Sequence, residues 1–189
     1  MSPGVVPGKS IFVGIFRIAY GRSDGIACFG SSSQAFLSSL APLLAFPLVG
    51  AGLAIATEGP RRALTGLAMT LCALLTPPIV SYELSRIWHR TDAWIRFATA
   101  FNWCEWILPL LAILLMVPLG VAISMGLNEA AASVVLFGCL ALYGLWLHWF
   151  LARKALALPV MRAVGLVFLV NLGTVAAVMG PRLLARGIG

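Results

Sequence analysis

The side chains that could do chemistry in this sequence are few, and four of them lie near the ends of long apolar stretches. They are Glu83, Asn102, Glu105 and His148. Asn102 and Glu105 stand three residues apart, so a helix would bring them to the same face. A carboxylate in such a stretch can accept a proton or a cation, or it can pair with a base such as His148. Asn171 lies deep in a further apolar stretch, and it joins the four as a candidate member of one polar pocket.

The same residues also have an interpretation that needs no ligand. Glu105 lies about one turn inside its stretch, where a long side chain can reach the interface between lipid and water. Asn171, with Thr174 close by on the same face, could hydrogen-bond a neighbouring helix. We favour this interpretation, because tryptophans gathered at a membrane surface form an aromatic belt and need no pocket to explain them. The six tryptophans are Trp88, Trp94, Trp103, Trp106, Trp146 and Trp149.

The sequence contains none of the motifs that identify a common catalytic, nucleotide or metal site. It has no HExxH, GxSxG, Walker or GxGxxG pattern, and its two histidines are His89 and His148. The cysteines share no ligand spacing, and a cysteine deep in an apolar stretch behaves as a small hydrophobic residue. We therefore expect no catalytic residue, no metal and no cofactor, which disfavours an intramembrane enzyme. The four cysteines are Cys28, Cys72, Cys104 and Cys139.

Charged residues set the architecture, because they divide the chain into long uncharged stretches. Hydrophobic residues make up 61% of the 189 residues and charged residues 10%, whereas about 25% of a typical globular protein is charged. A helix needs about 20 mostly apolar residues to cross a bilayer. The sequence therefore predicts an all-α bundle of five transmembrane helices. The uncharged stretches are 25–57, 63–82, 106–128, 130–152 and 163–181.

Two regions follow from this division. Residues 1–33 form a tail, in which the apolar residues 11–20 suit a helix lying in the plane of the headgroups, with an irregular tail as the alternative. Residues 34–186 form the transmembrane domain. The glycines and serines of 21–33 predict a hinge or loop. The expected spans are about 35–56, 63–84, 101–125, 130–151 and 162–180.

The ends of the spans carry further expectations. We expect the third span to follow a polar connection over residues 86–96. The fifth span is expected to end at Pro181, because proline often stops a helix. Prolines inside the first two spans would kink them.

The distribution of Lys and Arg predicts that the N-terminus is cytoplasmic and the C-terminus periplasmic. Nine basic residues fall on the N-terminal side and four on the other, and the richer side is normally cytoplasmic. The net charge of +7 then reflects topology and attraction to anionic headgroups, with no nucleic-acid partner. The nine are Lys9, Arg17, Arg22, Arg86, Arg90, Arg96, Arg153, Lys154 and Arg162; the four are Arg61, Arg62, Arg182 and Arg186.

The layout resembles the Yip family of five-span membrane proteins. The likeness rests on the number of spans, the N-terminal tail, and the end of the fourth span, Trp149-Phe150-Leu151-Ala152-Arg153-Lys154, with its short loop leading to Arg162. It covers residues 35–185. The chain lacks the long acidic or proline-rich N-terminal domain of the eukaryotic members. The resemblance implies an organising, non-enzymatic role, and no functional residue is carried over from it.

Two functional hypotheses result. The first, which we favour, is a bacterial inner-membrane protein that organises, assembles or regulates partners, with the bilayer and a membrane protein or second copy as its contacts. The bacterial address rests on a composition rich in Leu, Ala, Gly and Arg and poor in Lys, which fits a genome of high GC content. The alternative is a small transporter or channel subunit with a cytoplasm-facing polar site around Glu105. It requires Asn102, Glu105, His148 and Asn171 to line one cavity.

Overall fold

The computed structural model describes residues 9–187, and in this part of the chain every regular element is a helix. No strand occurs between residues 9 and 187, so the predicted all-α class is confirmed. In chain order the helices are α1 (Lys9–Ala19), the short 3-10 helix η1 (Ser23–Cys28), α2 (Ser33–Glu58), α3 (Pro60–Ile87), α4 (Thr91–Cys104), α5 (Ile107–Ser124), α6 (Glu129–Ala155) and α7 (Val160–Gly187).

Five helical segments of the described chain are long and apolar enough to cross a bilayer. Most of their length is apolar around the whole circumference, and large side chains such as Leu53, Leu114 and Phe137 are exposed. A helix of this kind needs lipid or another apolar partner around it. The chain is therefore a multi-pass membrane protein. The segments are Ser33–Glu58, Pro60–Ile87, Thr91–Ser124, Glu129–Ala155 and Val160–Gly180.

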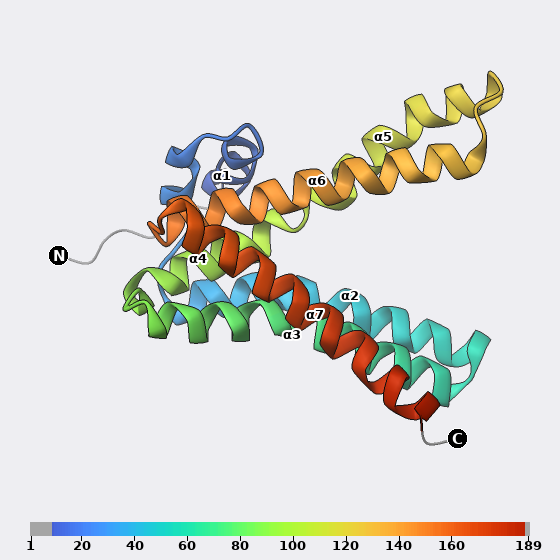
Figure 1. Cartoon of the computed structure of the whole chain (residues 1–189), viewed down its shortest axis with the longest axis horizontal. Helices are drawn as coiled ribbons and strands as arrows, with labels where there is room; N and C mark the ends of the chain where they lie inside the picture. The colour runs from blue at the N-terminus through green and yellow to red at the C-terminus, as the bar shows by residue number, and fades with distance from the viewer. Residues whose placement is uncertain (1–8, 188–189) are drawn as a thin grey trace.

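The helices form two arms that diverge from a common end (Figure 1). In one arm α3 packs against both α2 and α7, and in the other α5 and α6 form a hairpin. α1, η1 and α4 lie at the common end, together with the turns from α3 to α4 and from α6 to α7. The buried core also lies there, with Phe97 and Phe101 of α4 packed among Leu147 and Leu151 of α6 and Leu166 of α7.

Three helices end in the same hydrogen-bonded motif, which makes the following connections short. After α1, α3 and α5, a residue with positive φ follows the helix: Gly21 at 74°, His89 at 54° and Gly126 at 104°. The next amide bonds back to a carbonyl five residues earlier, as the N–H of Arg90 does to the oxygen of Ser85 at 2.8 Å. This is the Schellman arrangement. For this reason α3 and α4 are joined by residues 88–90 alone, where the sequence predicted a polar connection over 86–96.

Proline does not end the last helix as the sequence predicted. α7 continues through Pro181 to Gly187, just as α2 contains Pro42 and Pro47. A helix among lipids keeps its remaining backbone bonds because nothing else offers partners, so it tolerates proline better than a helix in water.

The described part of the N-terminal tail is a packed unit of two helices. A Cβ on Gly14 would lie 2.8 Å from the Cβ of Cys28, and one on Gly25 would lie 2.7 Å from the carbonyl oxygen of Gly14. Only glycine permits this approach, so the segment expected to be a hinge or loop contains η1, held against α1. The outer face of α1 carries Phe12 and Phe16, which are exposed. That this face lies on the membrane surface stays a prediction.

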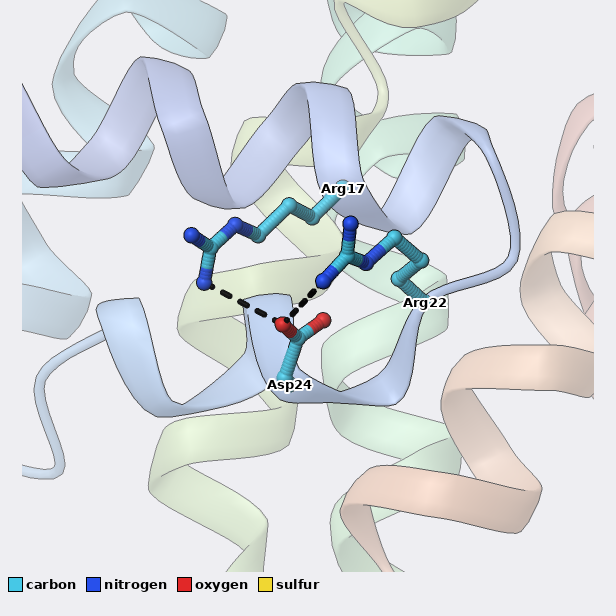
Figure 2. A network of polar contacts seen from close by, with 3 residues as sticks. All are labelled: Arg17, Arg22 and Asp24. Carbon is cyan, nitrogen blue, oxygen red and sulfur yellow. Dashed lines mark hydrogen bonds and ion pairs between the residues drawn. The ribbon is translucent and has the colours of Figure 1, made fainter.

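An ion cluster joins α1 to η1 (Figure 2). The carboxylate of Asp24 accepts from Nη1 of Arg17 at 3.2 Å and from Nη2 of Arg22 at 3.1 Å. The hydrogen bond from Arg22, with the positive charge of both guanidinium groups, lowers the pKa of Asp24 below its ordinary value of 3.8. Because the folded pKa lies below the unfolded one, this contribution to stability is present above the unfolded pKa and is lost as the pH falls through the folded value.

We predict that Asp24→Asn lowers the unfolding temperature of the detergent-solubilised chain slightly at about pH 7. The difference from the parent should shrink as the pH falls through the depressed pKa, because the parent carboxylate is then protonated too. Thermal unfolding followed by circular dichroism at several pH values measures both effects. Glu58→Gln is the matched control, since Glu58 forms no ion pair with the described residues. A difference that stays constant with pH would contradict the prediction.

Glycine also permits the close packing of α7 on α3. A Cβ on Gly173 would lie 3.2 Å from Cγ2 of Thr76 and 3.4 Å from Cγ2 of Val80, whereas one on Gly66 would meet no atom within 4 Å. Both glycines belong to patterns of small residues at four-residue spacing, which favour close helix approach. The structure places only Gly173 at such an approach.

We predict that Gly173→Leu destabilises the protein by about 1–3 kcal/mol, because the larger side chain pushes α7 away from α3. Gly66→Leu, the same change on an open face, should cause no loss. Unfolding of the solubilised protein by sodium dodecyl sulfate measures both variants. Equal losses would show that Gly173 does not hold the two helices together.

Candidate functional site

The third span is broken where its carboxylate lies. α4 ends at Cys104 and α5 begins at Ile107, so Glu105 and Trp106 form a turn inside an apolar segment. Pro109 explains the break: it has no N–H for the carbonyl of Glu105, and its ring crowds that oxygen. The oxygen accepts instead from the N–H of Leu108, at 3.3 Å. The sequence contained this signal, and the expectation of one continuous helix over 101–125 did not use it.

The break brings Glu105 to His148 on α6. Oε1 of Glu105 lies 2.7 Å from Nε2 of His148, and their side chains are 27% and 18% exposed. This separation is typical of a strong, charge-assisted hydrogen bond. The pair joins residues 43 positions apart in sequence, from the C-cap of α4 to the C-terminal third of α6.

The surroundings of His148 define what the pair can do. The ring of Phe101 lies against the imidazole, with 4.6 Å between the ring centroids. Nδ1 of His148 is buried and has no hydrogen-bond partner among the described atoms. Nε2 is therefore the ring nitrogen that contacts the carboxyl group. The contact places an imidazole and a carboxyl group at a distance that allows proton transfer between them.

Asn102 points away from this pair, into the contact between α4 and α2. Its Nδ2 donates to Oγ of Ser39 at 3.0 Å, and Ser39 donates to the carbonyl of Phe36 at 2.6 Å. Both side chains are almost fully buried, with Asn102 3% and Ser39 0% exposed. In lipid such a bond satisfies two groups that would otherwise have no partner. Asn102 therefore acts as a tie between helices.

A similar tie joins α4 to α3. Nε1 of Trp94 donates to Oγ of Ser81 at 3.1 Å, and Ser81 donates to the carbonyl of Pro78. The ring of Trp94 lies 5.4 Å from Phe36 and 4.9 Å from Tyr82, measured between centroids. Sequence reasoning assigned Trp94 to a surface belt and did not consider Ser39 or Ser81. Buried serine in an apolar run is the signal that could have indicated them.

Glu83 and Asn171 lie apart from the pair. Glu83 forms an exposed ion pair with Arg86 on its own helix, at 2.8 Å. Nδ2 of Asn171 donates to the carbonyl of Val167, at 2.8 Å, and Thr174 bonds in the same way to Val170. The structure thus brings Glu105 and His148 together and uses Asn102, Glu83 and Asn171 in separate contacts.

The small cavity beside Asn102 leaves no room for a substrate. It is lined by Pro78, Ser81, Phe101 and Asn102 among others, and it has a volume of about 10 Å³. That volume suits about one water molecule. Neither this cavity nor the larger hollow near the start of α2 is lined by Glu105, His148 or Asn171.

Metal ligands and thiols add little to the site. Among the residues that the structure describes, no group of three His, Cys, Asp or Glu side chains is arranged to hold a metal ion. The four cysteines are free, and Cys104 is buried at the end of α4. The chemistry of the site is that of the acid–base pair.

No protein family, curated protein or solved structure matches this chain. The resemblance to the Yip family therefore stays a prediction, and the interpretation of the site rests on its geometry.

We predict that Glu105→Gln and His148→Gln each destabilise the protein by about 2 kcal/mol, the value typical of a hydrogen bond to a charged group. The double variant should lose less than the sum of the two, because both changes remove the same interaction. Unfolding by sodium dodecyl sulfate at neutral pH completes the double-mutant cycle. Glu83→Gln should change stability by less than about 0.5 kcal/mol, since its pair is exposed. Additive losses would mean that the two side chains do not interact.

Proposed function

We propose that this chain is a non-enzymatic component of the bacterial inner membrane that organises, assembles or regulates other membrane proteins. The observation that carries the proposal is that Trp94, Asn102 and Glu105 of the third span are used in contacts between helices, while the arm of α5 and α6 is apolar and exposed. A transporter needs the opposite: polar groups free to line a path, and apolar groups packed away from it.

The polar contacts between helices come from α4 and from its C-cap, Glu105. Trp94, Asn102 and Glu105 each bond to a different neighbouring helix. The cavity that Asn102 lines has a volume of about 10 Å³, and none of the three residues lines the larger hollow near the start of α2. Their arrangement supports a structural role for the polar layer.

The exposed apolar surface lies on the arm of α5 and α6. α5 packs mainly against α6, and the two arms separate beyond the common end (Figure 1). Leu110, Leu114 and Val117 of α5 are 60–68% exposed, and Val134 and Leu142 of α6 are both 72% exposed. A surface of this length offers transmembrane helices of a partner a place to pack.

The proposed orientation has the N-terminus in the cytoplasm and the C-terminus in the periplasm. In Figure 1, α1 lies at the same end as the α3–α4 and α6–α7 turns, and the α2–α3 and α5–α6 turns lie at the other. This arrangement supports the grouping of basic residues into nine on one side and four on the other, and the positive-inside rule assigns the richer side to the cytoplasm.

We predict that a photoreactive residue at Leu114 cross-links to one integral membrane protein of discrete mass in cells that produce the chain. Leu114 is 68% exposed on α5, and Leu53, at 69% on α2, is the matched control on the other arm. The cross-linked species are identified by mass spectrometry of the purified adduct, and Leu53 should not give the same one. Absence of a protein adduct at Leu114, or the same ladder from both positions, contradicts the proposal.

A second function, that of a small transporter or channel subunit, is favoured by one observation. Oε1 of Glu105 lies 2.7 Å from Nε2 of His148 within a span, and Nδ1 of His148 has no partner among the described atoms. The chain reconstituted in vesicles with a pH-sensitive dye separates the two functions. An organising protein should give no proton or cation flux above that of empty vesicles. Flux that is present in the parent and lost in Glu105→Gln would favour the transporter.

A further inference from the structure

An open hollow lined by both polar and apolar side chains lies where the first span begins. It has a volume of about 750 Å³ and lies between the end of η1, the first turns of α2 and one face of α4. Its polar lining includes Ser31, Gln34 and Arg96, and its apolar lining includes Ile11, Phe29 and Trp103. A volume of this size is typical of sites for small ligands, and the mixed lining suits a molecule that is itself amphipathic.

Arg96 gives the hollow its charge. Its guanidinium makes one long hydrogen bond, from Nη2 to Oγ of Ser31 at 3.5 Å, and it forms no ion pair with any described carboxylate. By contrast, Arg17, Arg22 and Arg86 all have acidic partners. Among the residues that the structure describes, no Asp or Glu lines the hollow. An arginine left free beside hydroxyl and amide groups is suited to a phosphate.

The depth of the hollow indicates which phosphate it meets. α2 begins at Ser33, between Ser32 and Gln34 of the lining, and this helix is the first of the five that can cross the bilayer. The start of a span is the depth of the lipid headgroups, where a phosphate lies above the first methylenes of the acyl chains. The N-terminus of α2, which is the positive end of the helix dipole, lies at the same depth and attracts a negative charge as Arg96 does.

We propose that this hollow binds an anionic phospholipid, with the headgroup phosphate on Arg96 and the upper acyl chains against Phe29 and Trp103. Arg96 is the binding residue, and Ser31 and Gln34 supply the neutral donors. The absence of a carboxylate from the lining favours a headgroup without a cationic part. The inference does not depend on the organising function proposed above, since a transporter could hold the same lipid.

Binding is tested on the full chain in detergent, by the rise of its unfolding temperature as a short-chain lipid is added. Dioctanoyl phosphatidylglycerol should stabilise the protein with a saturable dose dependence. Dioctanoyl phosphatidylcholine and inorganic phosphate should do so only at about tenfold higher concentration or not at all. Arg96→Gln should raise the half-saturating concentration of phosphatidylglycerol about tenfold, which is the effect expected from a hydrogen bond between charged groups.

Two further variants keep the test decisive. Arg96→Lys retains the charge and should recover most of the binding. Arg90→Gln removes the same charge from the turn before α4, outside the hollow, and should bind as the parent does. If Arg96→Gln does not fold, Gln34→Leu, in the lining contributed by α2, takes its place, with an expected loss of a few-fold.

Three results would overturn the proposal. One is equal half-saturation by phosphatidylglycerol in the parent and in Arg96→Gln or its substitute. Another is equal weakening by Arg90→Gln, which would mean that only the overall charge matters. The third is the same stabilisation by phosphatidylcholine or by inorganic phosphate alone, which would assign the effect to apolar contact or to a free anion.

Discussion

A polar group inside a bilayer has no water to bond to, and the packing of α4 follows from this constraint. Trp94 bonds to α3, Asn102 to α2 and Glu105 to α6. Between these contacts, the residues of α4 from Phe97 to Phe101 are apolar or small, and all of them are buried. These hydrogen bonds reach three different helices, and each one restricts the rotation of its neighbouring helix about that helix's own axis. Apolar contacts alone, which are non-directional, would leave these rotations less well defined.

The positions of the spans could be predicted from the sequence, whereas their contacts could not. Charge-free length indicates a transmembrane helix directly, because the bilayer penalises charges whatever the fold. The partner of Asn102 is different: it depends on which face of α2 is turned inward, and α2 is apolar around nearly all of its circumference. Ser39 is one of several serines at the start of that helix, and nothing in its local sequence distinguishes it. The shared depth of Glu105 and His148 could be inferred, because both are near the ends of their stretches, but their contact required the break at Glu105.

Short connections illustrate the same limit. The sequence predicted a polar connection over residues 86–96 because this stretch includes Arg86, His89 and Asp92. The structure continues both helices into this region and reverses the chain at His89, which has a positive φ of 54°. Histidine adopts this conformation less readily than glycine does, so the turn has a weaker signature in sequence than the one at Gly126. Backbone hydrogen bonds, more than side-chain polarity, decide where these helices end.

The break before Pro109 also determines how the chain fits a bilayer of given thickness. Residues 91–124 count 34, and as one straight helix they would be about 51 Å long, far beyond a hydrocarbon layer of about 30 Å. Divided at Glu105, the segment leaves α5, with 18 residues, to cross most of that layer in about 27 Å. Because α6 runs without a break from the hairpin into the core of the common end, the hairpin and that end would tilt together, more in a thin bilayer and less in a thick one. The inclination of the hairpin would in this way report the thickness of the membrane around it.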